Sequence, residues 1–348
     1  MSSSPQASAV GEETASLDEL YQQALAEGGE LVVYAGGDTQ DQQSFTVDAF
    51  RAQFPDMRIT MVVDYSKFHD VRIDSQLAEG TLVPDVVQLQ TLQDFDRWKR
   101  EGKLLPYKPA GFSQVHDSFK DPDGTWTAIN VYAFSTTVSA DLPADEAPAT
   151  PPDLLDPRWK GQIASSYPQD DDAVLFLFKK YVQAYGWEWV DRFAEQDVHF
   201  ARGTHTPGLA VATGEKPIGV GGAGSLTTPM IPGTRWTVPD GHPFVAWGQR
   251  AAILNDARHP AAAKLYLNWQ LSTGPQEASY NGWSVREDVT PPGGLTPVWD
   301  YPNAYVEEFP AFMADRAQVE WWRYSFVLRL GEVTGAPSPG WLGSHPGR

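Results

Sequence analysis

Side chains of four different chemistries lie close together in the segment DYSKFHD. Tyr65 offers an aromatic face and Lys67 a cation, while His69 and Asp70 add an imidazole and a carboxylate. Such a set could clamp a polar ligand, or it could act as acid and base in proton transfer. We interpret the segment as half of a ligand clamp. The alternative is a solvated surface turn with Tyr65 packed on its domain.

Consecutive carboxylates at Asp170, Asp171 and Asp172 follow the segment ASSYPQ and precede a predicted helix. They could bind a hard cation or a cationic ligand, since oxygen ligands suit such ions. They could also only cap the helix and complement its dipole. We favour capping, which leaves these residues as weak candidates for a metal site.

A second group of candidates surrounds two glycine-containing turns. Arg202 and Thr204 occupy the turn ARGT, where a guanidinium could bind a carboxylate or phosphate in a bidentate manner. Gly222 belongs to the run PIGVGGAGS, in which the backbone could approach a ligand closely and Ser225 adds a hydroxyl. The run is neither a Walker loop nor a dinucleotide-binding fingerprint, so it gives no support for nucleotide binding.

Further candidate contacts are polar or aromatic side chains near the ends of predicted strands. Ser165, Ser166 and Tyr167 end one such strand, and their hydroxyls could donate or accept hydrogen bonds. Trp247 and Trp283 could stack on a ring or a cationic group, although most of the 13 tryptophans must be structural. The remaining candidates are Asp38, Thr39, Gln90 and Arg286.

Composition excludes several classes of function. A formal net charge of −19, with no local basic patch, would repel nucleic-acid phosphates and anionic membrane surfaces. No apolar run approaches the ~20 residues of a membrane-spanning helix. The absence of cysteine removes disulfides and thiolate chemistry, and no hydrolase elbow or HExxH motif fixes a catalytic site. We therefore expect no cofactor, no nucleic-acid partner and no membrane span.

The elements that must position these residues alternate between strand and helix. The predicted strands are 31–35, 59–63 and 85–89, and the predicted helices are 17–27, about 45–54, 71–79 and 94–101. This alternation is typical of a parallel sheet with helices on both faces. Ligands bind such sheets beyond the carboxyl ends of the strands, which here are the polar loops 36–39, 64–70 and 88–91.

A second α/β series follows an extended segment at 125–139, which we expect to cross between two lobes. That series contains GQIASSYP, a helix at about 172–195, VHFARGT, a helix at about 208–214 and PIGVGG. An apolar run at 244–253, a helix at 259–271, a helix at about 311–330 and an irregular tail complete the chain. The expected organisation is a flexible segment (1–16), lobe one (17–130), lobe two (131–243) and a return to lobe one with C-terminal helices and tail (244–348).

In order along the chain, five segments resemble the type 2 periplasmic binding proteins, in particular the ferric-iron and general extracellular solute-binding branch. They are LVVYAGG, PDVVQLQTLQDFDRWKREGKLLPY, DLLDPRWKGQIA, GEKPIGV and VPDGHPFVAWGQRAAILNDARHPAAAKLYLNWQLSTGPQEAS. The resemblance implies an α/β fold of two lobes, each a mostly parallel sheet flanked by helices, with a ligand cleft between them. It also implies a monomer that closes on a small molecule by hinge motion and delivers it to an ABC permease.

The resemblance also implies where a ferric site would lie. The iron-binding branch holds the ion through a tyrosine pair shortly after the strand PIGVGG, but here that stretch reads GGAGSLTTP. We therefore expect a small polar organic ligand rather than ferric iron. The alternative is an intracellular enzyme recruited from this fold, with acid/base chemistry in the same cleft. The first residues lack the charged and apolar regions of a signal peptide, so they do not themselves indicate export. We expect a periplasmic or extracellular protein whose leader has been trimmed, with a cytoplasmic protein as the alternative.

Overall fold

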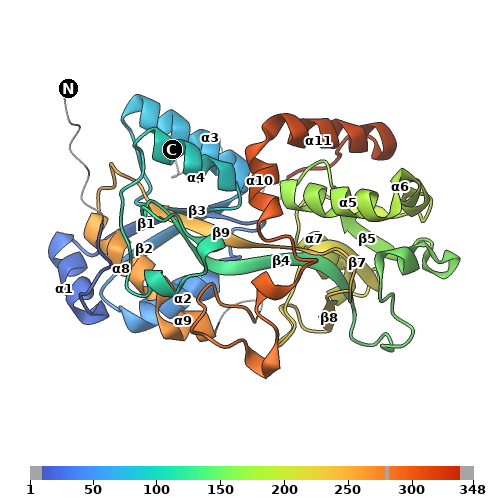
Figure 1. Ribbon diagram of the computed structural model, residues 1–348, viewed down its shortest axis with the longest axis horizontal. Coiled ribbons are helices and arrows are strands. Elements are labelled where there is room, and N and C mark those ends of the chain that lie inside the picture. The colour runs from blue at the N-terminus through green and yellow to red at the C-terminus, as the bar shows by residue number, and fades with distance from the viewer. Residues whose placement is uncertain (1–9, 279–281, 338–348) are drawn as a thin grey trace.

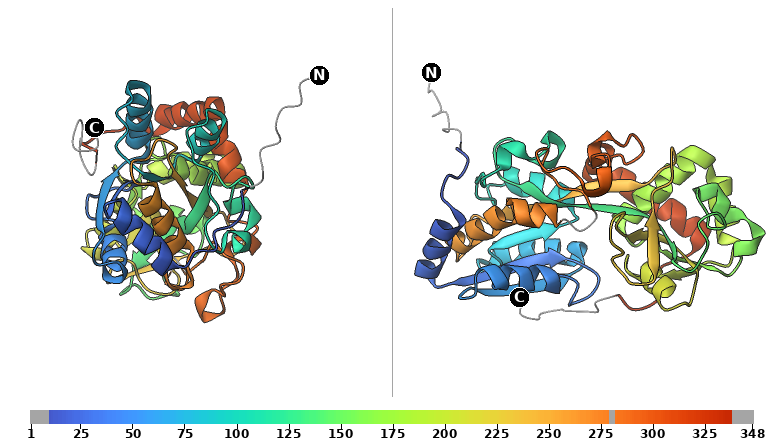
Figure 2. Two further views of the ribbon diagram at one scale, coloured as in Figure 1. Left: turned by 90° about the vertical axis from the view of Figure 1, so that its left-hand side faces the viewer. Right: turned by 90° about the horizontal axis from the view of Figure 1, so that it is seen from below.

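The computed structural model describes residues 10–278 and 282–337. Most of the expected flexible segment and the expected irregular tail, at 338–348, lie outside the described residues. Within the described part of the chain, nine strands form one sheet in the order β2-β1-β3-β9-β4-β7-β5-β6, with β8 paired to β4. Figure 2 shows two halves of the molecule joined by strands that run through both.

The first half is built from the alternating elements expected from the sequence. They are α1 (Leu17–Glu27), β1 (Glu30–Gly36), α2 (Ser44–Gln53), β2 (Arg58–Asp64), α3 (Ser66–Glu79), β3 (Val86–Leu89) and α4 (Leu92–Arg100). β1 pairs in parallel with both β2 and β3. Because successive strand residues face opposite sides, Leu31 and Val33 pack towards α2 and α8 while Tyr34 packs towards α3 and α4 (Figure 1).

The second half repeats this arrangement with its own parallel strands. Its elements are β5 (Ile163–Ser166), α5 (Asp172–Tyr185), α6 (Trp187–Ala194), β6 (His199–Ala201), α7 (Thr206–Ala212), β7 (Ile218–Ala223) and β8 (Thr234–Thr237). β5 pairs in parallel with β6 and β7. The core of this half is rich in aromatic side chains, among them Phe176, Trp189 and Phe326.

Strands β4 (Thr127–Ser139) and β9 (Val245–Ile253) join the halves. β9 pairs with β3 through 250–253 and with the first part of β4 through 245–251, both antiparallel. The second part of β4 pairs with β7 and β8. The expected crossing at 125–139 is therefore present, and β9 is a second crossing beside it.

The chain ends with helices that pack on both halves. They are α8 (Pro260–Leu271), α9 (Thr273–Glu277), α10 (Glu308–Ala314) and α11 (Arg316–Leu330). α8 packs on α1, whereas α11 packs on α5 and α6 (Figure 1). Short 3₁₀ helices lie at Phe112–Gln114, Asp117–Phe119, Pro151–Leu155, Pro157–Trp159, Pro292–Gly294 and Val298–Asp300.

Several element boundaries differ from the sequence predictions for local physical reasons. α3 begins at Ser66 rather than at residue 71, so most of DYSKFHD is helix and not loop. The helix expected at 172–195 is broken at Gly186, whose φ of 78° suits glycine. The helix expected at 311–330 is two helices, because Asp315 caps α11 by accepting a hydrogen bond from the backbone N–H of Gln318. β8 has no counterpart among the predicted strands.

Candidate ligand-binding site

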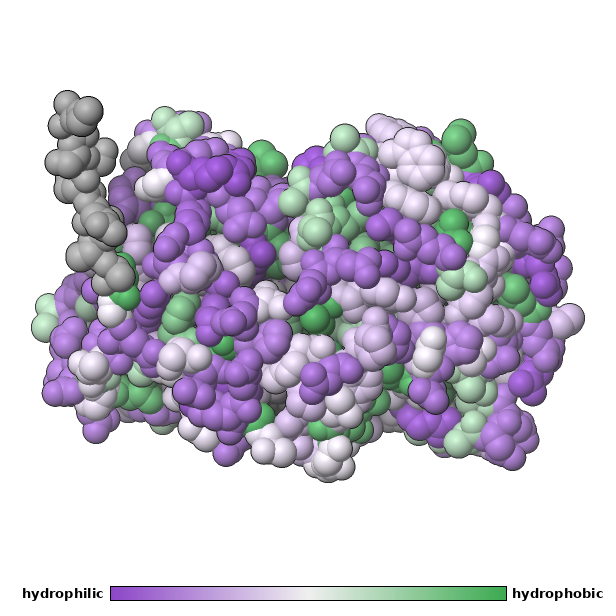
Figure 3. Space-filling view, in the orientation of Figure 1, coloured by the Kyte–Doolittle hydropathy of each residue, from purple (hydrophilic) through white to green (hydrophobic). Residues whose placement is uncertain are grey.

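A cavity of about 190 Å³ lies between the two halves, where the strands of both end. The wall from the first half comprises Gly36, Gly37, Asp38, Gln42, Tyr65, Ser66, Lys67, Asp70, Gln90, Thr91 and Gln93. The other lining residues are Tyr132, Phe134, Trp247 and Gln249 of the crossing strands, and Asp170, Asp171, Asp172, Gly203, Thr204, Ala223, Met313, Arg316 and Arg323 of the second half and the C-terminal helices. In the space-filling view the upper edge of the molecule is notched between α3 and α11, both of which line the cavity (Figure 3).

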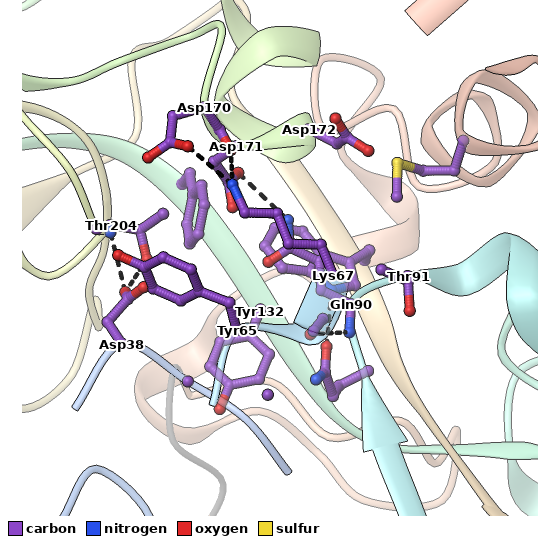
Figure 4. A pocket seen from close by; sticks show the side chains of 18 of the residues that line it. Asp38, Tyr65, Lys67, Gln90, Thr91, Tyr132, Asp170, Asp171, Asp172 and Thr204 are labelled. Atoms are coloured by element: carbon purple, nitrogen blue, oxygen red, sulfur yellow. Dashed lines mark hydrogen bonds and ion pairs between the residues drawn. The ribbon is translucent and has the colours of Figure 1, made fainter. Parts of the chain in front are cut away.

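Asp38 joins the end of β1 to the start of α7 across the cavity. Its Oδ2 accepts hydrogen bonds from the backbone N–H of Thr204 at 2.9 Å and from the Thr204 hydroxyl at 2.5 Å (Figure 4). The backbone N–H of His205 donates to the same oxygen at 3.1 Å. These bonds place a buried carboxylate from one half on backbone donors of the other. Charge-assisted bonds of this kind are stronger than neutral ones.

Lys67 and Arg202 meet at one carboxylate, that of Asp170. Lys67 Nζ donates to Asp170 Oδ1 at 2.8 Å and to the Asp170 carbonyl at 2.7 Å (Figure 4). Arg202 donates to the same carboxylate from Nε and Nη2 at 2.8 and 3.0 Å. Burial opposes ionisation of this carboxyl, but the bonds from Arg202 and the charge of Lys67 hold the pKa of Asp170 below its ordinary value. Arg202 thus holds the Asp170 carboxylate in position, and Lys67 of the opposite half donates to that carboxylate.

Asp171 forms a third link and also begins α5. Its Oδ1 accepts from the backbone N–H groups of Ala173 and Val174, both at 2.9 Å, which is the expected helix cap. Gln90 Nε2 donates to the same carboxylate from the other half at 3.2 Å (Figure 4). Burial raises the pKa of Asp171 to about 6, and the nearby charges of Asp172 and Asp38 act in the same direction.

Two arginines of α11 complete the upper wall. Arg316 Nη2 lies 2.8 Å from Asp172 Oδ2, and Arg323 Nη2 lies 2.5 Å from Asp172 Oδ1. The sequence reasoning missed both arginines together with Met313. One signal was present: positions seven apart in a helix share a face, so a predicted helix through 316–323 puts both guanidinium groups on one side.

Aromatic rings of the crossing strands form the floor of the cavity. Tyr132 and Trp247 are stacked with ring centroids 5.8 Å apart, and Phe134 meets Trp247 edge-on at 4.9 Å. Trp247 Nε1 donates to Gln249 Oε1 at 3.1 Å. Tyr132 and Gln249 also border a second hollow of about 320 Å³ beside α2 and α8. Trp247 was a predicted contact, whereas Tyr132, Phe134 and Gln249 were not.

His69 does not lie in the cavity, which corrects the interpretation of DYSKFHD as a single clamp. Its Nε2 donates to the carbonyl of Val62 at 3.0 Å, its Nδ1 lies 3.0 Å from Arg72, and its ring stacks on Tyr34 at 4.6 Å. Burial, together with the charge of Arg72, lowers the pKa of His69 to about 3. His69 is therefore a neutral core residue.

The structure places the other predicted contacts as follows. Asp38, Tyr65, Lys67, Gln90, Thr204 and Trp247 line the cavity with the carboxylates of 170–172, whereas Thr39, Ser165, Ser166, Tyr167, Arg202, Gly222, Ser225, Trp283 and Arg286 do not. The hydroxyl of Ser166 donates to the carbonyl of Gly203, and Arg286 is paired with Asp288. Trp283 is fully buried and donates to the carbonyl of Thr296. These side chains satisfy polar groups of the fold rather than face the cleft.

Within residues 10–278 and 282–337, no three His, Asp or Glu side chains are grouped so that they could hold a metal ion. In the same residues, no helix has the length and apolarity needed to cross a membrane.

Residues 83–207 match the family model of bacterial extracellular solute-binding proteins. The fold agrees over nearly all of the described chain. An Agrobacterium tumefaciens structure, the substrate-binding protein of an ABC transporter, superposes with a TM-score of 0.69 at 16% identity, covering 86% of this chain and 94% of that one. The chain has the fold of a two-lobed solute-binding protein.

Two further solved structures share this fold. AfuA of Actinobacillus pleuropneumoniae with bound fructose-6-phosphate gives a TM-score of 0.65 at 18% identity (87% and 99% of the two chains). Iron-bound HitA of Pseudomonas aeruginosa gives 0.64 at 15% (85% and 99%). An uncharacterized Haemophilus influenzae protein is 26% identical over 194 residues, which are 51% of this chain and 56% of that protein. The chain therefore matches little more than half the length of this relative.

These comparisons confirm the expected family resemblance and the two-lobed α/β fold. The matched family model describes extracellular solute-binding proteins, and AfuA is a periplasmic binding protein.

Proposed function

We propose that this solute-binding protein captures a small polar organic molecule in the cavity by hinge closure and presents it to an ABC-type importer. One observation carries the proposal: side chains of the first half bind the second half directly across the cavity. The links are Asp38 to Thr204, Lys67 to Asp170 and Gln90 to Asp171. Each can form only when the halves are closed, so together they stabilise a closed form around whatever the cavity holds.

The lining favours an organic ligand over ferric iron. Tyr65 and Tyr132 are the tyrosines of the cavity among the described residues, and neither lies after β7, which ends at Ala223. Burial raises the pKa of Tyr132, which keeps the phenol protonated and a poor ligand for a hard trivalent ion. The aromatic floor and the polar walls instead suit a small molecule with an apolar face and a few polar groups.

The same proposal covers location and partners. We infer a periplasmic or extracellular protein that acts as a monomer and docks on a permease, because the matching family model describes extracellular proteins. We also infer that the lobe boundaries fall in β4 and β9, near residues 131 and 244. Since α11 packs on α5 and α6, we place residues 308–330 with the second lobe in this scheme.

The test combines ligand identification with a measurement of closure. Native mass spectrometry of the purified protein should detect one bound small molecule, and small-angle X-ray scattering should show a smaller radius of gyration with that molecule than after its removal by unfolding and refolding. The monomer would be evident from the same mass spectrum. An unchanged radius of gyration with bound ligand would contradict hinge closure, and release of a chemically altered product would indicate an enzyme.

A further inference from the structure

Acidic side chains outnumber basic side chains in the lining of the cavity. Carboxylates are contributed by Asp38, Asp70, Asp170, Asp171 and Asp172, whereas cations are contributed by Lys67, Arg316 and Arg323. Each of these cations is already bound: Lys67 to Asp170, and both arginines to Asp172. Among the ion pairs of the described residues, none includes Asp70 or Asp171. Two carboxyl groups of the cavity therefore have no cationic partner within the described part of the protein.

Oxygen atoms without a hydrogen-bond partner gather on the wall formed by α3 and α4. Within the described residues, Thr91 Oγ1 and Gln93 Oε1 are buried and have no partner, and both residues line the cavity. Thr91 is only 6% exposed. Among the described residues, Oδ2 of the adjacent Asp94 is also buried without a partner. Buried polar atoms are normally satisfied, so this wall has fewer hydrogen-bond donors than its acceptors require.

Asp70 stands on the same wall, in α3. Burial and the neighbouring charge of Asp94 raise its pKa to about 7, and a hydrogen bond from the protonated Asp70 carboxyl to Asp94 acts in the same direction. The two carboxyl groups therefore lie side by side, and no cation among the described residues compensates Asp70 directly. A donor with its own positive charge would relieve both carboxylates, whereas an anion would add to the repulsion.

The aromatic rings of the cavity can also receive a cation. Lys67 Nζ lies 5.3 Å from the centroid of the Tyr65 ring, so an ammonium group already occupies one aromatic face here. Tyr132, Phe134 and Trp247 also line the cavity, at its floor. Indole and phenol rings attract organic cations when water is excluded.

We propose that the captured solute is an organic cation whose protonated amine binds Asp70, Thr91 and Gln93, with its carbon skeleton on the aromatic floor. This inference rests on the proposed solute-binding function and adds the chemical class of the ligand. An ammonium group has three donors, which matches one carboxylate, one hydroxyl and one amide oxygen. A metal ion fits less well, because no three His, Asp or Glu residues in the described part of the chain form a metal-binding group.

The first experiment compares probes of equal length and different charge. Isothermal titration calorimetry and thermal shift at pH 8 are run with 1,4-diaminobutane, 1,4-butanediol and succinate, and with tyramine and phenylethanol as an aromatic pair. We expect the amines to bind at least about tenfold more tightly than their neutral partners. If only the diol, the alcohol or the dicarboxylate binds, the inference of an organic cation is overturned, but the solute-binding proposal stays intact. Binding of no probe, with no co-purified molecule in native mass spectra, counts against both.

The second experiment locates the amine with matched variants. Asp70→Asn should weaken amine binding about tenfold or more, and Thr91→Val should weaken it several-fold. Asp48→Asn is the control, since Asp48 is an exposed residue of α2 outside the cavity. Circular dichroism and thermal unfolding verify that each variant folds. Wild-type affinity in a folded Asp70→Asn protein would overturn the assignment.

Discussion

Asp38 and Thr204 are 166 residues apart in sequence, yet Asp38 Oδ2 lies 2.9 Å from the backbone nitrogen and 2.5 Å from the hydroxyl of Thr204. The contact joins the loop after β1 to the loop before α7, which belong to different halves of the molecule. It depends on the relative position of the halves and not on either half alone. Loss of this contact should therefore change the equilibrium between the open and closed forms more than it changes the free energy of unfolding.

Replacing Asp38 by alanine should shift the protein towards the open form. The variant loses an acceptor of several charge-assisted hydrogen bonds, so we expect ligand affinity to fall about tenfold or more and the radius of gyration to increase. Calorimetry and small-angle scattering measure the two effects. Asp41→Ala in the same loop is the control, because Asp41 is exposed and does not line the cavity. Equal effects of both substitutions would argue against a specific link at Asp38.

Amine binding should strengthen as the pH rises from about 5.5 to 8. The charged form of Asp70 is the binding form, and its pKa in the free protein is about 7. The charged groups beside it are Asp94 on α4, which also binds Arg97, and Asp74 on α3. Calorimetry across this pH range should give an affinity that levels off above pH 8, and Asp70→Asn should remove most of the slope. A flat profile in the wild-type protein would contradict the role of Asp70.

The same carboxyl gives a prediction for stability. A pKa raised in the folded state means that the fold binds a proton more tightly than the unfolded chain. The contribution of Asp70 is thus favourable in acid and is lost as the pH rises from about 4 to about 7. We expect Asp70→Asn to increase the free energy of unfolding at pH 8 by about 1 kcal/mol and to change it little at pH 4. Urea unfolding at the two pH values measures this difference.

Arg202→Met should destabilise the protein and make it more sensitive to acid. Arg202 and Asp170 form a partly buried pair, with side chains 16% and 11% exposed, so loss of the guanidinium should cost about 2 kcal/mol. The lowered pKa of Asp170 implies stability that is present at neutral pH and lost as the pH falls through that lowered value. In Arg202→Met this loss should begin at higher pH. As a control, Arg58→Met breaks the exposed pair with Glu30 and should cost less than about 1 kcal/mol.

Gly36→Ala should disturb the cavity wall without a change of charge. A Cβ at this position would lie 2.3 Å from Ser66 Oγ, which accepts a hydrogen bond from the backbone N–H of Gln90 at 3.0 Å. The methyl group must displace Ser66, and with it the loop that carries Gln90 and Thr91. We expect ligand affinity to fall about tenfold, whereas Gly11→Ala, with open space around its Cβ, should have no effect. Calorimetry of the two variants tests this.

Much of the fold could be predicted from local patterns. Residues 17–27 form the expected helix because Ser16 and Glu19 make a capping box and Gly28 follows the last turn. Asp38 and Gln90 could be placed in the cavity because parallel strands end on one side of a sheet. His69 could not be placed correctly, since the early start of α3 has no side-chain cap at Tyr65 to mark it. That start turns His69 towards Tyr34 and leaves Lys67 and Asp70, three residues apart, on the cavity side.

The arginines of α11 could not be placed in the cavity from the sequence, because their position depends on how distant helices pack. Arg316 and Arg323 reach Asp172 over 144 and 151 residues of sequence, and no local pattern specifies that α11 packs on α5. Long-range packing of this kind depends on the aromatic core that Phe178, Trp187 and Phe326 form together. Their spacing predicts helices but not the pairing of those helices.

The position of β9 between β3 and β4 has a consequence for how the chain folds during synthesis. A ribosome must complete residue 253 before the first half has its full sheet, and must reach α11 before the second half has its full core. Contacts of such large sequence separation form slowly. The nascent polypeptide should therefore remain incompletely folded for most of its translation, a state that chaperones recognise and that a translocation channel for unfolded chains could accept.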